Sequence, residues 1–405
     1  MLNAETRFLF VTTSSLATNP RLVKELKKAS EMATCHVVYF NSSDWSQTFN
    51  TEIENQVQDV LFHRININRF NFLYLSSKLG NKIFKKLRFL HKFEFFNSVS
   101  ISDRSILLII YLFCLRCIFK FSLVIGHNIG VFFPITLLFS KNKIVVLDIE
   151  DFHPGERSSD SDDYSKRVQL FRNTLAKASF LTYASPLIGE YSLKLIPDFP
   201  ITKSALINNC FNASDFRFKE YLDNKISFVW FSQNIAAGRG LEWIIPTLFE
   251  YKVKVHLTLI GNLYQNFYDE FLINYKEVLT ILPPLHQDEL HSKLCEFDIG
   301  LALEQVSSDI NKDICLSNKI FAYVQSGLYV LATATHGQSA FLDKHSTLGL
   351  LCSSDENMLE TTIDTLIKNI FEIRKIKNER FEYAKKLSWE NESEKLVDIW
   401  RELLK

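Results

Sequence analysis

Two apolar, strand-like runs in the first half of the chain end in side chains that can exchange protons. His127 follows the run Leu123–Gly126, and Asp151 follows the run Lys143–Asp148. In an open α/β protein, side chains at the carboxyl ends of parallel strands line the ligand crevice. There a histidine and a carboxylate can work as general acid and base, so His127 and Asp151 are candidate catalytic residues. His153, in the proline-bounded loop that follows, is a further candidate.

The second half of the chain carries cations where helices are expected to begin. Arg239 stands directly before Gly240, which opens an apolar run typical of a helix over 240–250. A cation at a helix N-terminus is electrostatically unfavourable unless an anion binds there. The free N–H groups of that terminus, together with a guanidinium, suit a diphosphate. Asn318 and Lys319 stand at the start of another expected helix, over 318–326, and are also placed for phosphate.

Strand-like and helix-like runs alternate along the chain in two series. The expected strands of the first series are Arg7–Thr12, Cys35–Phe40, Leu123–Gly126, Lys143–Asp148 and Phe180–Tyr183, and those of the second are Ile226–Phe231, Val255–Gly261, Val278–Leu282, Asp298–Leu303 and Leu328–Thr333. Between the first two strands, Asn19 suits a helix N-cap and Pro20 suits the first helical position. The alternation predicts the α/β fold class, with two doubly wound parallel sheets in series.

Length and composition agree with two globular domains. A chain of 405 residues favours two domains of about 200 residues each. A polar, turn-rich stretch over 205–215 is suited to a linker, so we expect an N-terminal domain over 1–220 and a C-terminal domain over 221–386. Lys plus Arg equals Asp plus Glu at 46 each, so no net charge favours nucleic acid as a partner.

The seven cysteines are scattered, and only Cys114 and Cys117 are close in sequence. Both lie in the apolar run Ser105–Phe119, which contains Arg116 and is shorter than the ~20 residues that span a bilayer. We expect this run to be a buried helix and the cysteines to be buried thiols rather than metal ligands. Free thiols indicate the reducing cytosol, and the N-terminal residues lack the features of a signal peptide.

Three runs in the second half resemble family 4 glycosyltransferases. They are FSQNIAAGRGLEWII (231–245), LPPLHQDELHSKLCEFDIGLALEQ (282–305) and LSNKIFAYVQSGLYVLAT (316–333). The last run, LSWENESEKLVDIWRELL, resembles the family's final helix, and LVIGHNIGVFFP and VVLDIEDFHPGE are similar to its cleft loops. The resemblance implies a GT-B fold, in which two Rossmann-like domains face a cleft and the helix over 387–405 packs back on the N-terminal domain.

The resemblance also implies roles for individual residues. Arg239 would bind the donor diphosphate. Glu304 would contact the transferred sugar, and together with His127 and Asp151 it would be a catalytic residue. Gln233 stands where the family often has an arginine. The implied donor-binding residues are Arg239, Gln233, Gly240, Ser317, Asn318 and Lys319, and the acceptor-side residues are Ser14 and Ser15.

The implied activity is a retaining hexosyl transfer from a nucleotide sugar to a glycan or lipid-linked acceptor, without metal or other cofactor, in bacterial surface polysaccharide assembly. Ala322 stands where many members carry a second glutamate that binds the ribose. Two alternatives stay open: a nucleotide-sugar 2-epimerase of the same fold, and a catalytically silent partner subunit. Asp148 and Asp151 are also similar to the metal-binding pair of the other glycosyltransferase fold, GT-A, but the nucleotide signals lie in the second half of the chain.

Residues 81–96 interleave five Lys and Arg residues with aromatic residues and leucines. An amphipathic helix here could pack on its own domain. Alternatively, it could make peripheral contact with an anionic membrane, which would place a cytoplasmic enzyme at the inner face of the cell membrane.

Overall fold

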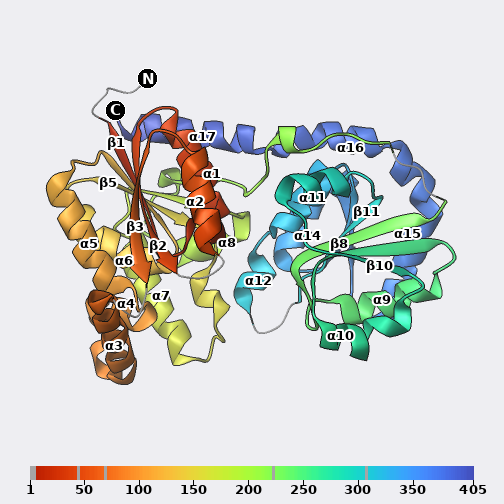
Figure 1. Ribbon diagram of the computed structural model, residues 1–405, viewed down its shortest axis with the longest axis horizontal. Coiled ribbons are helices and arrows are strands. Elements are labelled where there is room, and N and C mark those ends of the chain that lie inside the picture. The colour runs from red at the N-terminus through yellow and green to blue at the C-terminus, as the bar shows by residue number, and fades with distance from the viewer. Residues whose placement is uncertain (1–5, 43–45, 68–70, 221–223, 306–308) are drawn as a thin grey trace. The chain divides into compact units, whose positions relative to one another are not determined.

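The computed structural model describes residues 6–42, 46–67, 71–220, 224–305 and 309–405, and the chain divides into two compact units (Figure 1). The first comprises residues 1–207, 308–311 and 393–405, and the second comprises 208–307 and 312–392. The first unit ends before residue 220 because the following segment binds the second. The backbone N–H of Asn208 donates to Glu392 at 3.0 Å, and Gln325 bonds both the N–H and the C=O of Phe211, at 3.0 and 2.8 Å.

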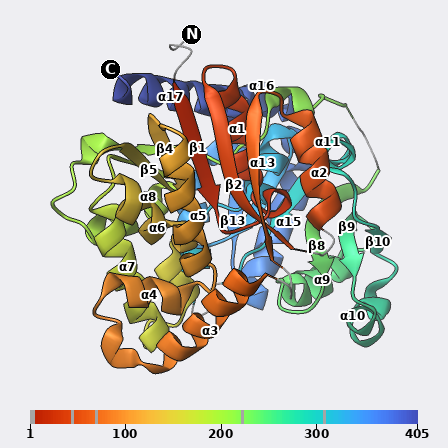
Figure 2. The same ribbon diagram turned by 60° about the vertical axis from the view of Figure 1, so that its left-hand side comes forward.

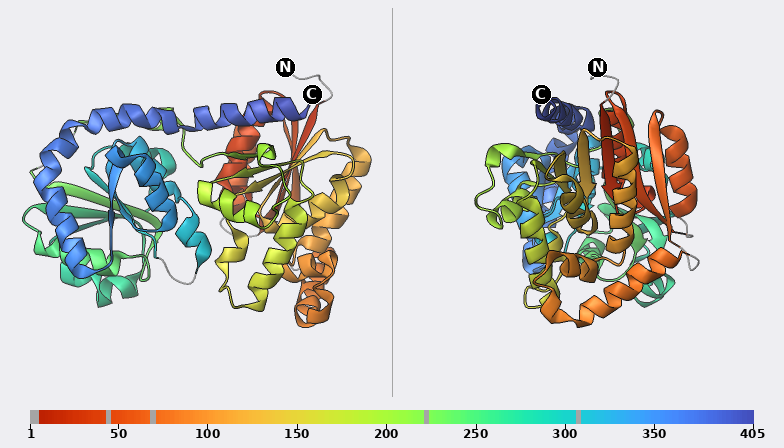
Figure 3. Two further views of the ribbon diagram at one scale, coloured as in Figure 1. Left: turned by 180° about the vertical axis from the view of Figure 1, so that it is seen from behind. Right: turned by 90° about the vertical axis from the view of Figure 1, so that its left-hand side faces the viewer.

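The first unit contains a seven-stranded parallel sheet in the order β3-β2-β1-β4-β5-β6-β7. Its strands are β1 (Arg7–Thr12), β2 (Thr34–Ser42), β3 (Val60–Ile67), β4 (Leu123–His127), β5 (Ile144–Ile149), β6 (Phe180–Tyr183) and β7 (Ser204–Leu206). Its helices are α1 (Pro20–Ser30), α2 (Ser46–Gln56), α3 (Phe72–Lys86), α4 (Glu94–Ile101), α5 (Ser105–Ile118), α6 (Ile129–Phe139), α7 (Asp162–Leu175) and α8 (Pro186–Lys194). Figures 2 and 3 show these helices on both faces of the sheet.

The second unit contains a six-stranded parallel sheet in the order β10-β9-β8-β11-β12-β13. Its strands are β8 (Ile226–Ile235), β9 (Val255–Leu263), β10 (Leu279–Leu282), β11 (Ile299–Ala302), β12 (Tyr329–Thr333) and β13 (Gly349–Cys352). Its helices are α9 (Leu241–Glu250), α10 (Gln265–Glu270), α11 (Gln287–Leu294), α13 (Asn318–Gln325), α14 (His336–Lys344), α15 (Glu356–Lys375) and α16 (Lys377–Ala384), while α12 (Ile310–Ile314) and α17 (Trp389–Leu403) each have residues in both units.

The predicted pair of doubly wound parallel sheets is confirmed, because the apolar runs are buried strands. Residues 8–12 of β1 have almost no exposed surface, and the Asn19 side chain accepts the N–H of Leu22 at the start of α1. Three strands, β3, β7 and β13, were not predicted. Of these, β3 lies at an edge of its sheet with only one fully buried residue, and β7 is three residues long.

The C-terminal helix contributes to the core of the first unit. Trp400 is fully buried. Its ring forms T-shaped contacts with the rings of Phe8 and Phe10, at centroid distances of 5.7 and 6.4 Å. Lys28 of α1 forms an ion pair with Glu394 at 2.9 Å. Residues 393–405 therefore belong to the first unit although they follow the second in sequence.

The expectation that Ser105–Phe119 is a wholly buried helix is wrong. One side of α5 packs inward through residues such as Leu112, but Phe113 and Ile118 are exposed. Cys114 and Cys117 lie on the exposed side, so the prediction that they are buried thiols is also wrong, whereas Cys35, Cys210, Cys295 and Cys352 are buried. Within the described residues no single helix is long and apolar enough to cross a bilayer, and α4 with α5 reaches that length only as a pair bent by 114°.

The segment 81–96 is not the single helix that its composition suggests. Helix α3 ends at Lys86, a short 3-10 turn covers 88–90, and α4 begins at Glu94. The break is stabilised by His91, whose Nε2 lies 2.6 Å from the carbonyl oxygen of Phe84. This contact satisfies a carbonyl of the last helical turn, which has no partner inside the helix.

Candidate active site

In each sheet the strand order reverses beside the first strand of the unit, between β1 and β4 and between β8 and β11. Open α/β sheets bind ligands at the carboxyl ends of the strands flanking such a switch point. The segment after β1 is Thr12–Ser15 and the residue ending β4 is His127. The loop after β8 leads to Arg239, and Glu304 follows β11. Ser14, Ser15 and His127 thus stand beside the switch point of the first unit, and Arg239 and Glu304 beside that of the second.

At the switch point of the first unit, Asn128 has a positive φ of 75° and links the loop that follows β1 to the end of β4. Its side-chain NH₂ donates to the Thr12 hydroxyl at 2.9 Å, and its side-chain oxygen accepts from the Thr13 hydroxyl at 2.7 Å. Ser15 points inward to Thr18, at 2.9 Å between the hydroxyl oxygens. Ser14 is half-buried, so of the two predicted acceptor-side serines it is the one that retains solvent contact.

Asp148, at the end of β5, is the centre of a buried ion pair. Arg21 donates from Nε to Oδ2 at 2.7 Å and from Nη2 to Oδ1 at 2.8 Å, and its Nη1 donates to the carbonyl of Ile207 at 2.6 Å. The Thr182 hydroxyl donates to Oδ1 at 2.5 Å. Burial would raise the pKa of Asp148, but Arg21 and His127 hold it below the usual range. Asp148 therefore stabilises the fold, and its buried carboxylate is not accessible to a substrate.

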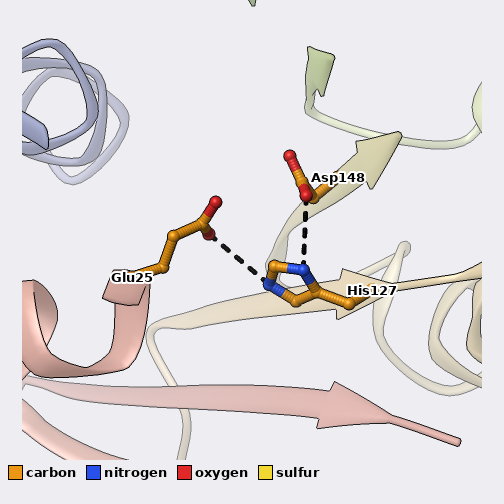
Figure 4. A group of neighbouring side chains, drawn as sticks. All are labelled: Glu25, His127 and Asp148. Carbon is orange, nitrogen blue, oxygen red and sulfur yellow. Dashed lines mark ion pairs between the residues drawn. The ribbon is translucent and has the colours of Figure 1, made fainter. Parts of the chain in front are cut away.

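His127 is also fully buried and therefore does not line a surface as the sequence predicted. Its Nδ1 lies 2.9 Å from Glu150 Oε1 and 3.3 Å from Asp148 Oδ2, and its Nε2 lies 3.4 Å from Glu25 Oε2 (Figure 4 shows Glu25, His127 and Asp148). Burial would lower the pKa of His127, but the three carboxylates raise it well above its ordinary value. The imidazole is therefore a buried cation among carboxylates.

Glu25, His127 and Asp148 also offer ligand atoms within 4.8 Å of one another, close enough for a metal ion. Arg21, however, engages both carboxylate oxygens of Asp148 and lies 3.4 Å from Glu25. A guanidinium in that position would repel a divalent cation. The donor set therefore fits an ion-pair network better than a coordination shell.

Asp151 and His153 are also held by neighbouring side chains. The Asn311 side chain donates to Asp151 Oδ1 at 2.9 Å and accepts the N–H of Phe152 at 2.8 Å. His153 is buried, with its Nδ1 2.7 Å from a carboxylate oxygen of Glu156. Sequence reasoning missed Asn311 because it follows Asp151 by 160 positions.

In the second unit, the loop before α9 is shaped by two glycines in the left-handed region. Gly238 has φ +76° and Gly240 has φ +84°, values that other residues adopt with strain. Gly240 caps α9, which begins at Leu241 rather than at Gly240. The N–H of Gly238 donates to the Glu242 carboxylate. Arg239 is exposed between these glycines, at the positive end of the helix.

Glu304 lies beside a pocket of about 380 Å³ at the carboxyl ends of β11, β12 and β13. Its carboxylate is 3.4 Å from the Lys319 ammonium, and its N–H donates to the Thr333 hydroxyl at 2.9 Å. Lys319 in turn lies over the ring of Trp230, 5.8 Å from the centroid. The pocket is lined by Trp243, Glu304, Gln305, Thr333, Ala334, Cys352, Ser353 and Ser354.

The remaining predicted donor residues lie at the starts of α13 and the β8 loop. Ser317 occupies the N-cap position of α13 without capping it, and its buried hydroxyl has no hydrogen-bond partner in the described part of the chain. Asn318 and Gln233 are exposed. Ala322, in the middle of α13, is fully buried.

No family model and no curated protein sequence matches the chain. Solved structures do match over nearly its whole length. HepE of Anabaena in complex with UDP and glucose shares 13% identity at a TM-score of 0.64, over 98% of this chain and 100% of that one. A glycosyltransferase of Rickettsia africae shares 12% identity at 0.66, over 99% of both chains.

Sucrose-phosphate synthase of Thermosynechococcus elongatus shares 11% identity at a TM-score of 0.69, over 98% of this chain and 99% of that one. Each of these matches covers both parallel-sheet units of this chain rather than one of them. The chain thus has the GT-B fold that these glycosyltransferases share.

Proposed function

We propose that this protein is a glycosyltransferase that moves a sugar from a nucleotide sugar to a glycan or lipid-linked acceptor in bacterial surface polysaccharide assembly. The supporting observation is the chemistry of the second unit's switch point. There the exposed Arg239, the free N-terminus of α9 and the start of α13 stand beside a pocket lined by Glu304. HepE, which has the same fold, is solved with UDP-glucose.

The proposed mechanism assigns the diphosphate to the cationic side of this crevice. As the bond between the sugar and the diphosphate breaks, negative charge grows on the leaving phosphate. Arg239, Lys319 and the helix N-termini stabilise that charge, so the transfer proceeds without a metal ion. Glu304 orients the donor sugar, and we propose that the anomeric configuration is retained.

Turnover of nucleotide sugars tests this function. The protein is incubated with UDP-, GDP-, CMP- and dTDP-sugars, with and without glycan acceptors, and release of the free nucleotide is followed. We expect one donor class to be consumed, slowly by hydrolysis and faster with acceptor. Interconversion to the 2-epimer without nucleotide release would instead assign the epimerase, and binding without turnover would assign a silent partner subunit.

We further propose that the protein binds an anionic membrane surface through α3. Several apolar residues of this helix face solvent, whereas its buried residues are small or polar. Its inward face carries small and polar residues: Ser77 is fully buried, and the buried Asn81 donates to the carbonyls of Val99 and Ser100 at 2.7 and 3.1 Å. Its exposed apolar residues are Phe72, Leu73, Leu75, Leu79 and Ile83, with exposed fractions between 43 and 77%.

The charge of this segment fits the same partner. Residues 72–92 contain no Asp or Glu. The exposed lysines are Lys78, Lys82, Lys85, Lys86 and Lys92. An exposed apolar stripe flanked by cations is typical of helices that lie in the interface of anionic bilayers. Each lysine near an anionic leaflet contributes about 1 kcal/mol, and each buried Leu or Ile side chain about 1.5–3 kcal/mol.

A further inference from the structure

The buried network around His127 has one member that reaches solvent, and that member is Glu150. Glu25, His127 and Asp148 are closed off, whereas the Glu150 side chain is 25% exposed. Arg21 and Thr182 already bond the carboxylate of Asp148. Glu150 is therefore the only carboxylate of this cluster that a ligand can touch.

His127 contacts one carboxylate oxygen of Glu150, whose side chain is partly exposed. Nδ1 of His127 lies 2.9 Å from Oε1 of Glu150, and this contact orients the carboxylate at the end of β5. That strand is next to β4, so Glu150 stands beside the switch point where Asn128 and Ser14 lie. A carboxylate oxygen in such a crevice accepts hydrogen bonds, and those from hydroxyl groups are short and strong.

We propose that Glu150 is the residue of the first unit that binds a hydroxyl group of the sugar acceptor, with His127 as its positioning residue; this rests on the proposed function. The ligand class is a polyol, because the partly exposed Glu150 carboxylate and the half-buried Ser14 hydroxyl are hydrogen-bonding groups rather than an apolar or cationic surface. We therefore assign to Glu150 the acceptor-side role that was predicted for His127 and Asp151.

The two nitrogens of His127 allow a sharp test. In His127→Asn the amide nitrogen replaces Nδ1 and can still donate to Glu150. In His127→Gln it replaces Nε2, so the contact with Glu25 persists and that with Glu150 is lost. A merely structural role for His127 predicts equal damage from both substitutions, whereas a positioning role predicts that only Gln impairs acceptor binding.

Acceptor binding is measured by saturation-transfer NMR on the full chain, with the methyl glycosides of glucose, galactose and mannose as probes and with UDP titrated separately. We expect Glu150→Gln and His127→Gln to weaken glycoside binding about 10-fold or more, while His127→Asn stays near wild type. Glu156→Gln, which alters a carboxylate that contacts the buried His153, is the matched control and should leave glycoside binding unchanged.

The outcomes separate this inference from the proposed function. Glycoside binding that survives Glu150→Gln, or the absence of any glycoside signal with wild-type protein, overturns the assignment of Glu150. Nucleoside diphosphate affinity resides in the second unit and should be the same in all variants. If wild-type protein binds glycosides through Glu150 but no nucleotide, the proposed transferase function fails while the acceptor site stands.

Discussion

Replacing Asp148 by Asn should strongly destabilise the first unit, because it would remove the charge of the carboxylate that the buried Arg21 guanidinium bonds through two of its nitrogens. Both side chains have no exposed surface and are joined by two hydrogen bonds of 2.7 and 2.8 Å, so solvent screening does not reduce the effect. Removing one partner of a buried ion pair typically costs about 3–5 kcal/mol. For a unit of this size that corresponds to a fall in melting temperature of roughly 6–20 °C.

The assay is calorimetric or urea-induced unfolding, with each unit followed by its own transition. A matched control exists in the second unit, where Arg374 donates to Asp298 at 2.9 and 2.8 Å. Asp298→Asn should lower only the second unit's transition, and Asp148→Asn only the first. The double variant Arg21→Met with Asp148→Leu should be less damaged than Asp148→Asn, because it removes both charges. A loss below about 1 kcal/mol in Asp148→Asn would refute the reasoning.

Three further predictions concern ligands. Arg239→Ala should weaken the binding of nucleoside diphosphate, measured by titration calorimetry, by about 1.5–3 kcal/mol. Unchanged affinity would show that Arg239 does not bind the donor. Glu304→Gln should lower turnover while leaving affinity for the bare nucleoside diphosphate nearly intact, and equal loss of both would indicate a structural role. Leu79→Ser with Ile83→Ser should reduce co-sedimentation with phosphatidylglycerol-containing vesicles, whereas Phe371→Ser, which changes a still more exposed apolar residue of α15, should not. Wild-type protein that stays in the supernatant at low salt would contradict the membrane contact.

The fold could be predicted because its signals are local. Apolar runs such as Arg7–Thr12 become buried strands wherever polar turns bound them, and Asn19 with Pro20 marks a helix start within a few residues. Two open sheets then follow from the alternation of strands and helices, and the switch points follow from the strand order.

The chemistry of the first crevice could not be predicted in the same way, because it depends on distant partners. The sequence indicates that His127 ends a strand, but Arg21 and Glu25 come from α1, and they turn this strand end into a closed ion network. Glu150 stands between Asp148 and Asp151 in the sequence, and it is distinguished by a contact with His127 combined with a partly exposed side chain.

Helix α3 shows the same dependence on tertiary contacts. Its composition is amphipathic, but which side faces inward is decided by the two bonds that Asn81 donates to the backbone of α4. The break that ends α3 likewise depends on a contact of His91 with Phe84, which the periodicity of the segment does not reveal.

Hydrogen exchange with free nucleotides tests the central claim most directly, because it locates the donor site on the chain. UDP, GDP, CMP and dTDP are added in turn, and amide exchange is followed by mass spectrometry across all described segments. The account predicts that one nucleotide slows exchange at residues 238–243 and 317–320, where the N-termini of α9 and α13 would bind the diphosphate. Protection confined to the first unit, or no protection by any of the four nucleotides, would contradict it.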